Sequence, residues 1–162
     1  MTATKLRFKV RRSRIQGFGA FATQRIRKGT RIIEYKGERI SPKQGDARYE
    51  NGHSKDAPVL LFTVDKRTVI DAGVGGNEAR FINHSCEPNC EAVIDTRRVF
   101  IEAIRTISSD EELTYDYNLT RDGQDDRQTE KEYACHCGAA NCRGTMLEPL
   151  PIRKKRKRKK AK

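Results

Sequence analysis

Residues Arg80 to Cys90 read RFINHSCEPNC, and the interpretation of the whole chain depends on this stretch. It places an asparagine, a histidine and two cysteines within eight residues, whereas the full chain has only 5 cysteines and 3 histidines. A proline separates the two cysteines. The stretch alone leaves three interpretations open: half of a metal site, a redox pair, or a tight loop that holds a ligand.

The other three cysteines lie in CHCGAANC at 135–142, a C-x-C-x4-C knuckle with Gly138 where the backbone must turn. Structural zinc prefers four tetrahedral ligands, so three thiolates require a fourth ligand from elsewhere. Cys86 or Cys90 could supply it and would tie the C-terminal segment to the central loop. His136 is a poorer candidate because it sits between two ligands and would have to fold back. Without a metal, the cysteines would be small buried apolar residues.

Length and composition predict one compact domain. The chain has 162 residues, of which 35% are apolar, enough for a modest core. Its net charge is +12, but Arg153 to Lys162 alone holds nine basic and no acidic residues, which leaves +3 for the rest. A block of like charges repels itself, so we expect a disordered tail. It suits targeting to a nucleus or nucleoid, or contact with nucleic acid, and charge does not choose between them.

No apolar run approaches the roughly 18 to 20 residues that a membrane span requires, and the Met1 end lacks the apolar centre of a secretory signal. We therefore expect an intracellular protein with no membrane partner, in the cytoplasm unless the tail directs it to a nucleus or nucleoid, and a secreted effector is the alternative. We also expect a monomer. An intracellular compartment disfavours disulfides, and the odd number of cysteines agrees. Metal binding becomes the leading explanation for the clustered cysteines.

The apolar pattern is typical of short strands. Leu6, Phe8 and Val10 alternate with basic residues, which is the period of a half-buried strand. Further strand-like runs are Arg31 to Tyr35, Val59 to Val64, Thr68 to Asp71, Glu91 to Ile94 and Val99 to Ala103. Asp95 to Arg98 suggests a hairpin turn, and the polar segment 41–58 holds at most one short helix, around 43–50. These patterns predict a mainly β fold with few short helices.

Composition also divides the chain into four segments. We expect the β body at 5–119, a charged linker at 120–132, the cysteine-bearing segment at 133–148 and the basic tail at 149–162.

Four motifs occur in a fixed order: RIQGFGAFA at 14–22, EYKGE at 34–38, GNEARFINHSCEPNC at 76–90 and EELTYDYN at 111–118. In this order, and followed by the cysteine knuckle, they resemble the SET-domain protein-lysine methyltransferases with the zinc-binding segment that follows the SET domain. The resemblance implies several small β-sheets and a pseudoknot, in which RFINHSC threads beneath the strand that precedes ELTYDY.

The resemblance also assigns residues to two bound groups. Structural Zn²⁺ is held by Cys86, Cys135, Cys137 and Cys142, which leaves Cys90 over. S-adenosylmethionine, the methyl donor, is held by Gln16, Gly17, Phe18, Asn83 and His84. Leu60 departs from the family pattern, because many relatives have a tyrosine there that packs against the cofactor.

For catalysis, the resemblance makes Tyr117 the residue beside the methyl-transfer axis. Tyr35 and Phe62 line the lysine channel, and Tyr115 limits the product to mono- or dimethyllysine. Taken singly, each of these aromatic residues would be read as ordinary strand packing.

The function that follows is methylation of a lysine in a protein, such as a histone or another basic chromatin-associated protein. One alternative is a zinc-containing basic protein that binds nucleic acid through the tail and the stretch Lys5 to Arg14. Another is a SET domain that binds lysine peptides without catalysis.

Overall fold

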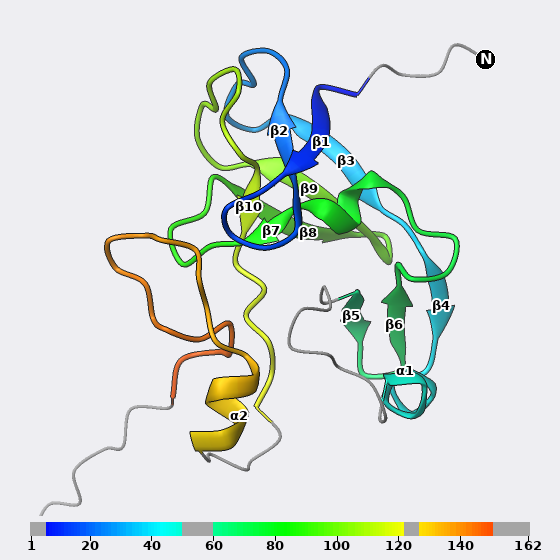
Figure 1. The fold of residues 1–162 in the computed structure, drawn as a ribbon. Coiled ribbons are helices and arrows are strands. Elements are labelled where there is room, and N and C mark those ends of the chain that lie inside the picture. Colours follow the sequence, from blue (N-terminus) through cyan, green and yellow to red (C-terminus); the bar gives the residue numbers. More distant parts are fainter. Residues whose placement is uncertain (1–5, 50–59, 122–126, 151–162) are drawn as a thin grey trace, which may run out of the picture.

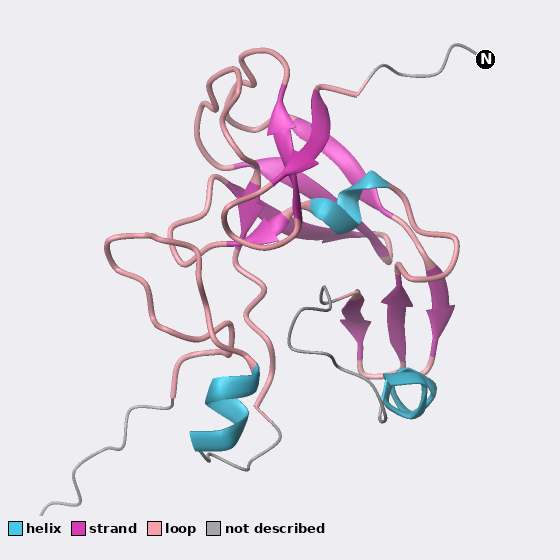
Figure 2. Cartoon of the chain, in the orientation of Figure 1, coloured by secondary structure: helices cyan, strands magenta, loops and turns pink. Residues whose placement is uncertain are grey.

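The computed structural model describes residues 6–49, 60–121 and 127–150, and Figure 1 traces the chain. Three small β-sheets make up the body, accompanied by short helices (Figure 2). One sheet pairs β1 (Phe8–Arg12) with β2 (Phe18–Ala22). The second has the order β4 (Glu38–Ile40), β6 (Thr68–Asp71) and β5 (Leu61–Asp65). The helices are α1 (Pro42–Tyr49), α2 (Arg127–Glu132) and a 3-10 turn at Glu78–Phe81.

The third sheet has five strands and brings distant segments together. Its order is β3 (Arg31–Tyr35), β9 (Arg98–Ala103), β8 (Cys90–Asp95), β10 (Thr114–Tyr115) and β7 (Asn83–His84). β10 is parallel to both β7 and β8, so it lies between two strands that follow one another in the chain. The connection at 85–89 therefore crosses over β10. The strand that is inserted belongs to ELTYDY itself, a difference from the prediction that the preceding strand is crossed.

The core lies between the β1–β2 sheet and the five-stranded sheet. It includes the fully buried side chains Ile26, Ile82, Ile101, Ile107 and Leu113. Ile26 and Ile107 also exchange two backbone hydrogen bonds of 2.9 Å, which hold the loop after β2 beside the loop after β9. These five apolar side chains come from five different segments, and their burial in one core holds the two sheets together beside the site.

The predicted elements compare closely with the observed ones. β3 and β6 have the predicted bounds, and the turn at 95–98 joins β8 to β9 with Thr96 and Arg97 in the left-handed region, at φ 46° and 64°. The short strands β2, β4, β7 and β10 were not predicted. Part of the expected linker forms α2, whereas residues 122–126 and the basic tail from 151 onward lie outside the described residues.

No helix among the described residues combines the length and the apolar character that crossing a membrane requires.

Candidate functional site

Four aromatic side chains from three parts of the chain form a continuous row. The ring centroids of Tyr35 and Phe62 are 5.5 Å apart. Tyr115 continues the row, 6.4 Å from Phe62 and 4.8 Å from Tyr117. Tilted aromatic pairs at such separations stabilise by about 0.5–1.5 kcal/mol beyond simple burial. The structure thus brings together the four aromatic residues to which the resemblance assigned catalytic roles.

Tyr117 is fixed at two points. Its hydroxyl donates a hydrogen bond of 2.9 Å to the carbonyl oxygen of Ile82, and its backbone N–H donates to Nδ1 of His84 over 3.1 Å. Burial raises the pKa of this phenol far above its usual value, so the hydroxyl stays neutral. Because the proton is committed to Ile82, the oxygen presents its lone pairs to any neighbouring positive charge.

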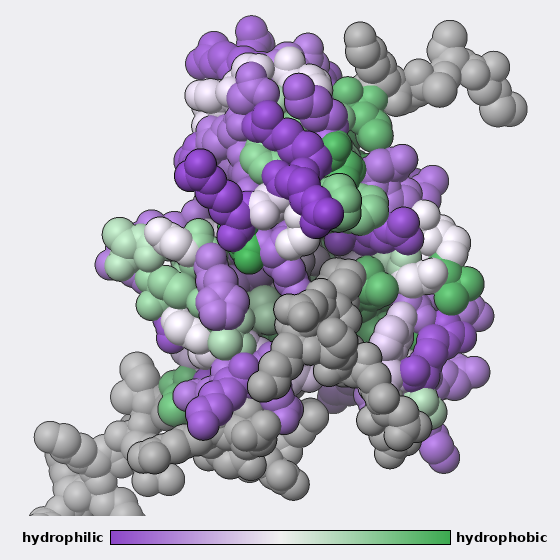
Figure 3. Space-filling model, viewed as in Figure 1, coloured by the Kyte–Doolittle hydropathy of each residue, from purple (hydrophilic) through white to green (hydrophobic). Residues whose placement is uncertain are grey.

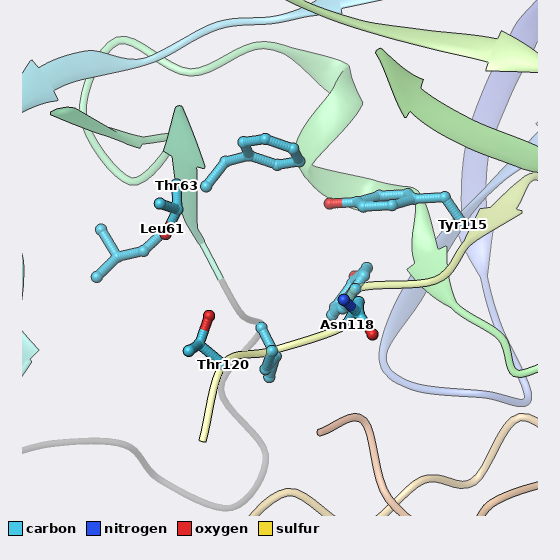
Figure 4. A pocket seen from close by; sticks show the side chains of 8 residues that line it. Leu61, Thr63, Tyr115, Asn118 and Thr120 are labelled. Carbon is cyan, nitrogen blue, oxygen red and sulfur yellow. The ribbon is translucent and has the colours of Figure 1, made fainter. Parts of the chain in front are cut away.

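A pocket of about 200 Å³ opens beside this row. Its lining comes from β5 and from the chain that leaves β10, namely Leu61, Phe62, Thr63, Tyr115, Tyr117, Asn118, Leu119 and Thr120. Figure 4 shows the hydroxyl of Tyr115 directed from the β10 side toward the β5 side. The pocket therefore has one aromatic wall and one wall of small polar and aliphatic side chains.

Tyr35 is not among the residues that line this pocket. It packs behind Phe62, is 3% exposed, and donates its hydroxyl to the carbonyl oxygen of Leu60 over 3.0 Å. Tyr35 thus supports the aromatic wall from behind, and Leu60 contributes its backbone to that support.

The turn before β2 lies against Asn83. The side-chain Nδ2 of Asn83 is 3.0 Å from the carbonyl oxygen of Phe18 and 3.4 Å from that of Gln16. Gly17 adopts a φ of 40°, a conformation that glycine reaches without steric cost. Phe18 is 47% exposed, which is unusual for a large apolar ring. The residues predicted to hold a methyl donor therefore form two adjoining groups. Gln16, Gly17 and Phe18 make the turn, and Asn83 and His84 make the strand β7 beside it.

Glu112 joins this group, although the sequence analysis did not single it out. Its Oε1 accepts from Asn83 at 2.8 Å and from the hydroxyl of Ser13 at 2.7 Å. A Cβ atom at Gly19 would collide with the Glu112 carboxylate, so the close approach requires glycine there. Glu112 is placed in the site by its contact with Asn83, 29 positions away in the chain, and no local sequence pattern reveals such a contact.

His84 connects the aromatic row to the cysteines. Its Nδ1 accepts the amide of Tyr117, so the proton is assigned to Nε2, which lies 3.4 Å from Sγ of Cys86. Burial lowers the pKa of His84 to about 4, and Asp116 opposes that shift only in part. The imidazole is therefore neutral at physiological pH and donates toward the sulfur.

The four cysteines predicted to bind zinc form a single cluster in which all Sγ atoms lie within 4.8 Å of one another. The Sγ of Cys86 is 3.7 Å from that of Cys135 and 3.9 Å from that of Cys142. Four thiolates around tetrahedral zinc, with bonds of about 2.3 Å, lie about 3.8 Å from each other. The spacing therefore fits that ion.

Each sulfur in the cluster also accepts a backbone N–H over 3.3 to 3.5 Å. Although burial opposes ionisation, the amides of Cys86 and Ala139 lower the pKa of Cys137 to about 6. A closed set of four thiolates is typical of a structural zinc site rather than a catalytic one.

Cys90 lies apart from the cluster. It is 0% exposed within the core, and burial raises the pKa of its thiol to about 12. A protonated, enclosed thiol is a packing residue. Of the two cysteines that the residues alone left open as a fourth ligand, Cys86 lies in the cluster and Cys90 does not.

A two-bonded ion pair joins the cysteine segment to the aromatic row. The guanidinium of Arg143 donates to the carboxylate of Asp116 over 2.7 and 2.8 Å. Asp116 lies between the two tyrosines of the row in the chain, and the Arg143 amide donates to Sγ of Cys86. The sequence analysis did not find this pair. We refer to these two residues as the clasp.

A family model described as the SET domain matches residues 17–118. The chain belongs to the SET-domain family. The SET match contains the turn before β2, the crossed segment around Asn83 and the row that ends at Tyr117. The cysteine-bearing segment follows it in the chain.

The chain is also similar in sequence to named histone-lysine methyltransferases. The chain is 45% identical over 141 residues to "Histone-lysine N-methyltransferase, H3 lysine-4 specific" of Saccharomyces cerevisiae, covering 83% of the chain and 13% of that protein. It is 40% identical over 139 residues to "Histone-lysine N-methyltransferase 2D" of Homo sapiens, covering 83% of the chain and 2% of that protein. The chain thus spans a small part of these SET relatives.

Proposed function

We propose that this chain is a protein-lysine N-methyltransferase that uses S-adenosylmethionine and acts on a histone, with lysine 4 of histone H3 as the first site to test. The observation that carries the proposal is Tyr117, whose hydroxyl proton is held by Ile82 at the rim of an aromatic pocket. The printed names of the relatives support the substrate class. A histone substrate would place the protein in the nucleus.

S-adenosylmethionine supplies, when bound, a methyl group on a positively charged sulfonium. The residues that would hold it are Gln16, Gly17, Phe18, Asn83 and His84. Three observations support this assignment: the exposed ring of Phe18, the polar side chain of Asn83 beside the turn, and the neighbouring Glu112 carboxylate, which suits a cationic group.

The pocket would prepare the lysine amine. Free lysine has a pKa of about 10.4, so its amine must lose a proton to solvent before it can attack. Phe62, Tyr115 and Tyr117 form an aromatic wall that replaces water, and desolvation disfavours the ammonium. The nitrogen lone pair then forms the new N–C bond while the S–C bond breaks.

Tyr117 would act through its oxygen. The lone pairs that face away from Ile82 stabilise positive charge as it passes from the sulfonium to the amine. The row behind this residue keeps the ring in place, so that positioning supplies much of the rate. Zn²⁺ would remain structural, because all four of its predicted ligands are protein thiolates.

The test is methyl transfer from labelled S-adenosylmethionine to recombinant histone H3, to H3 in which lysine 4 is replaced by arginine, and to other basic proteins. We expect transfer to H3 that the lysine replacement removes. Tyr117→Phe should lower kcat about 100-fold, equivalent to about 2.7 kcal/mol, while S-adenosylmethionine still binds.

Other results would point elsewhere. Absence of S-adenosylmethionine binding by the zinc-loaded protein would reject the methyltransferase and favour a zinc-containing nucleic-acid binder. Binding of both the methyl donor and a lysine peptide without transfer would indicate a peptide-binding SET domain. Transfer to another protein only would keep the activity and reject histone H3.

A further inference from the structure

The first 33 residues of the chain contain no acidic residue. Six of the exposed basic side chains among the described residues of this stretch form what we call the basic face: Arg7, Lys9, Arg11, Arg25, Arg27 and Lys28. Arg7 directly precedes β1, Lys9 and Arg11 lie on β1, and the others lie on the loop that follows β2.

The two halves of the basic face adjoin. Phe8 and Val10 pack into the core, so the alternate residues of β1 face outward. The amide of Thr23 donates to the carbonyl oxygen of Arg7 over 2.9 Å, which fixes the start of the loop beside the start of β1. Ile26 is buried between Arg25 and Arg27, which anchors the loop. In Figure 1 these elements stand together at the top of the molecule, where Figure 3 shows mainly hydrophilic residues.

Little of this positive charge is neutralised. Among the described residues, Asp110 is the carboxylate within 4.0 Å of the basic face, and it is shared by Lys9 and Arg11. Arg11 also stacks on the ring of Phe21, with its guanidinium carbon 3.9 Å from the centroid, so its position is preorganised. Six positive charges against one negative charge attract an anionic partner.

The basic face lies at a distance from the pocket. The pocket is lined by β5 and the chain after β10, which occupy the lower half of Figure 1. A partner on the basic face would leave the pocket open. The face is therefore suited to hold a large anion while the pocket receives a peptide.

We propose that the basic face binds the phosphate backbone of duplex DNA. Four of its six cations are arginines, whose planar forks match phosphate oxygens. Alternate residues of a strand are about 6.6 Å apart, so the row on β1 spans about 13 Å, along which a duplex presents about eight phosphates. A lipid surface would call for apolar anchors. Among the described residues, the large exposed apolar side chains near the row are Leu6, at 36%, and Phe18, which belongs to the site described above.

The test measures binding of the full zinc-loaded chain to a fluorescent 20-base-pair duplex between 50 and 200 mM potassium chloride, without methyl donor. One variant is R25Q/R27Q/K28Q, and a second is R7Q/K9Q/R11Q. The control K43Q/K66Q/R67Q removes the same charge from exposed residues elsewhere: Lys43 lies on α1, and the other two lie in the turn between β5 and β6. All proteins keep the basic tail, so a contribution of the tail cancels.

Each phosphate contact contributes about 0.9 to the slope of log K against log salt, so loss of three contacts lowers that slope by about 2.7. Over this salt range the difference amounts to about 40-fold in affinity. We expect at least a unit of slope to be lost in both face variants and none in the control. Equal slopes in the unchanged protein, both face variants and the control would overturn the proposal. Face variants that lose binding to an acidic polypeptide but keep binding to the duplex would overturn it too. DNA binding is measured without methyl transfer, so the result tests the basic face independently of the proposed methyltransferase activity.

Discussion

The clasp between Arg143 and Asp116 is a partly buried ion pair with two hydrogen bonds, and its removal should destabilise the fold. Two charge-assisted hydrogen bonds of 2.7 and 2.8 Å join side chains that are only 26% and 32% exposed. Breaking a buried pair costs about 3–5 kcal/mol, whereas an exposed pair contributes about 0.2–1 kcal/mol. The partial exposure places Arg143→Ala between these limits, at about 2 kcal/mol.

The assay is thermal unfolding of zinc-loaded Arg143→Ala, Asp116→Ala and the double variant. A loss of about 2 kcal/mol lowers the Tm of a chain of this size by about 6 °C. We expect a coupling energy of about 1.5 kcal/mol from the double-mutant cycle, because the orphaned carboxylate and guanidinium are each unfavourable alone.

A matched pair supplies the control. Arg98 and Glu34 also form two hydrogen bonds, of 2.9 and 2.6 Å, but Arg98 is 58% exposed. Its cycle should give about 0.5 kcal/mol. Glu34 is only 20% exposed, so the two pairs differ chiefly in the burial of the arginine. If the coupling of the clasp were no larger than that of this pair, burial of Arg143 would not be the source of its strength.

Three further predictions concern the zinc cluster, the methyl donor and the product. Cys137→Ser should release zinc and Cys90→Ser should retain it, as measured by atomic absorption; retention by both would remove Cys137 from the ligand set. Asn83→Ala should weaken binding of S-adenosylmethionine about tenfold by calorimetry, and unchanged affinity would contradict its assigned role. Tyr115→Phe should shift the product about fivefold toward trimethyllysine by mass spectrometry, because loss of one hydroxyl removes a hydrogen bond of about 1 kcal/mol that holds water in the channel; trimethyllysine as the main early product of the unchanged protein would refute this.

The sequence predicted those strands that a local pattern of apolar residues marks. β3 and β6 are runs of alternating or continuous apolar residues, and their bounds agreed with the structure. β7 and β10 have two residues each and form through parallel pairing with one another and, for β10, with β8 as well. No local propensity marks such a strand, because its stability comes entirely from tertiary contacts.

The residues of the candidate site also fall into two groups, those that a motif identified and those that only the fold revealed. Motif order, read through resemblance, assigned the tyrosines and the cysteines, and the structure places them together. The sequence analysis missed Glu112 and the clasp because the contacting residues are 29 and 27 positions apart, respectively, and Glu112, Asp116 and Arg143 are ordinary charged residues. A surface carboxylate and a half-buried one look identical in a sequence, and only the fold distinguishes them.

The crossing of 85–89 over β10 has a consequence for the order of folding. The hairpin of β8 and β9 is local and can form early, in about 1–10 μs for such a unit. β10 must then enter between β7 and β8, against the entropy of closing a loop of some thirty residues. Refolding should therefore be limited by this late insertion, and the aromatic row should be the last part to gain native fluorescence. Until β10 arrives, the edges of β7 and β8 remain open to pairing with other chains, which makes this step the point at which aggregation competes with folding.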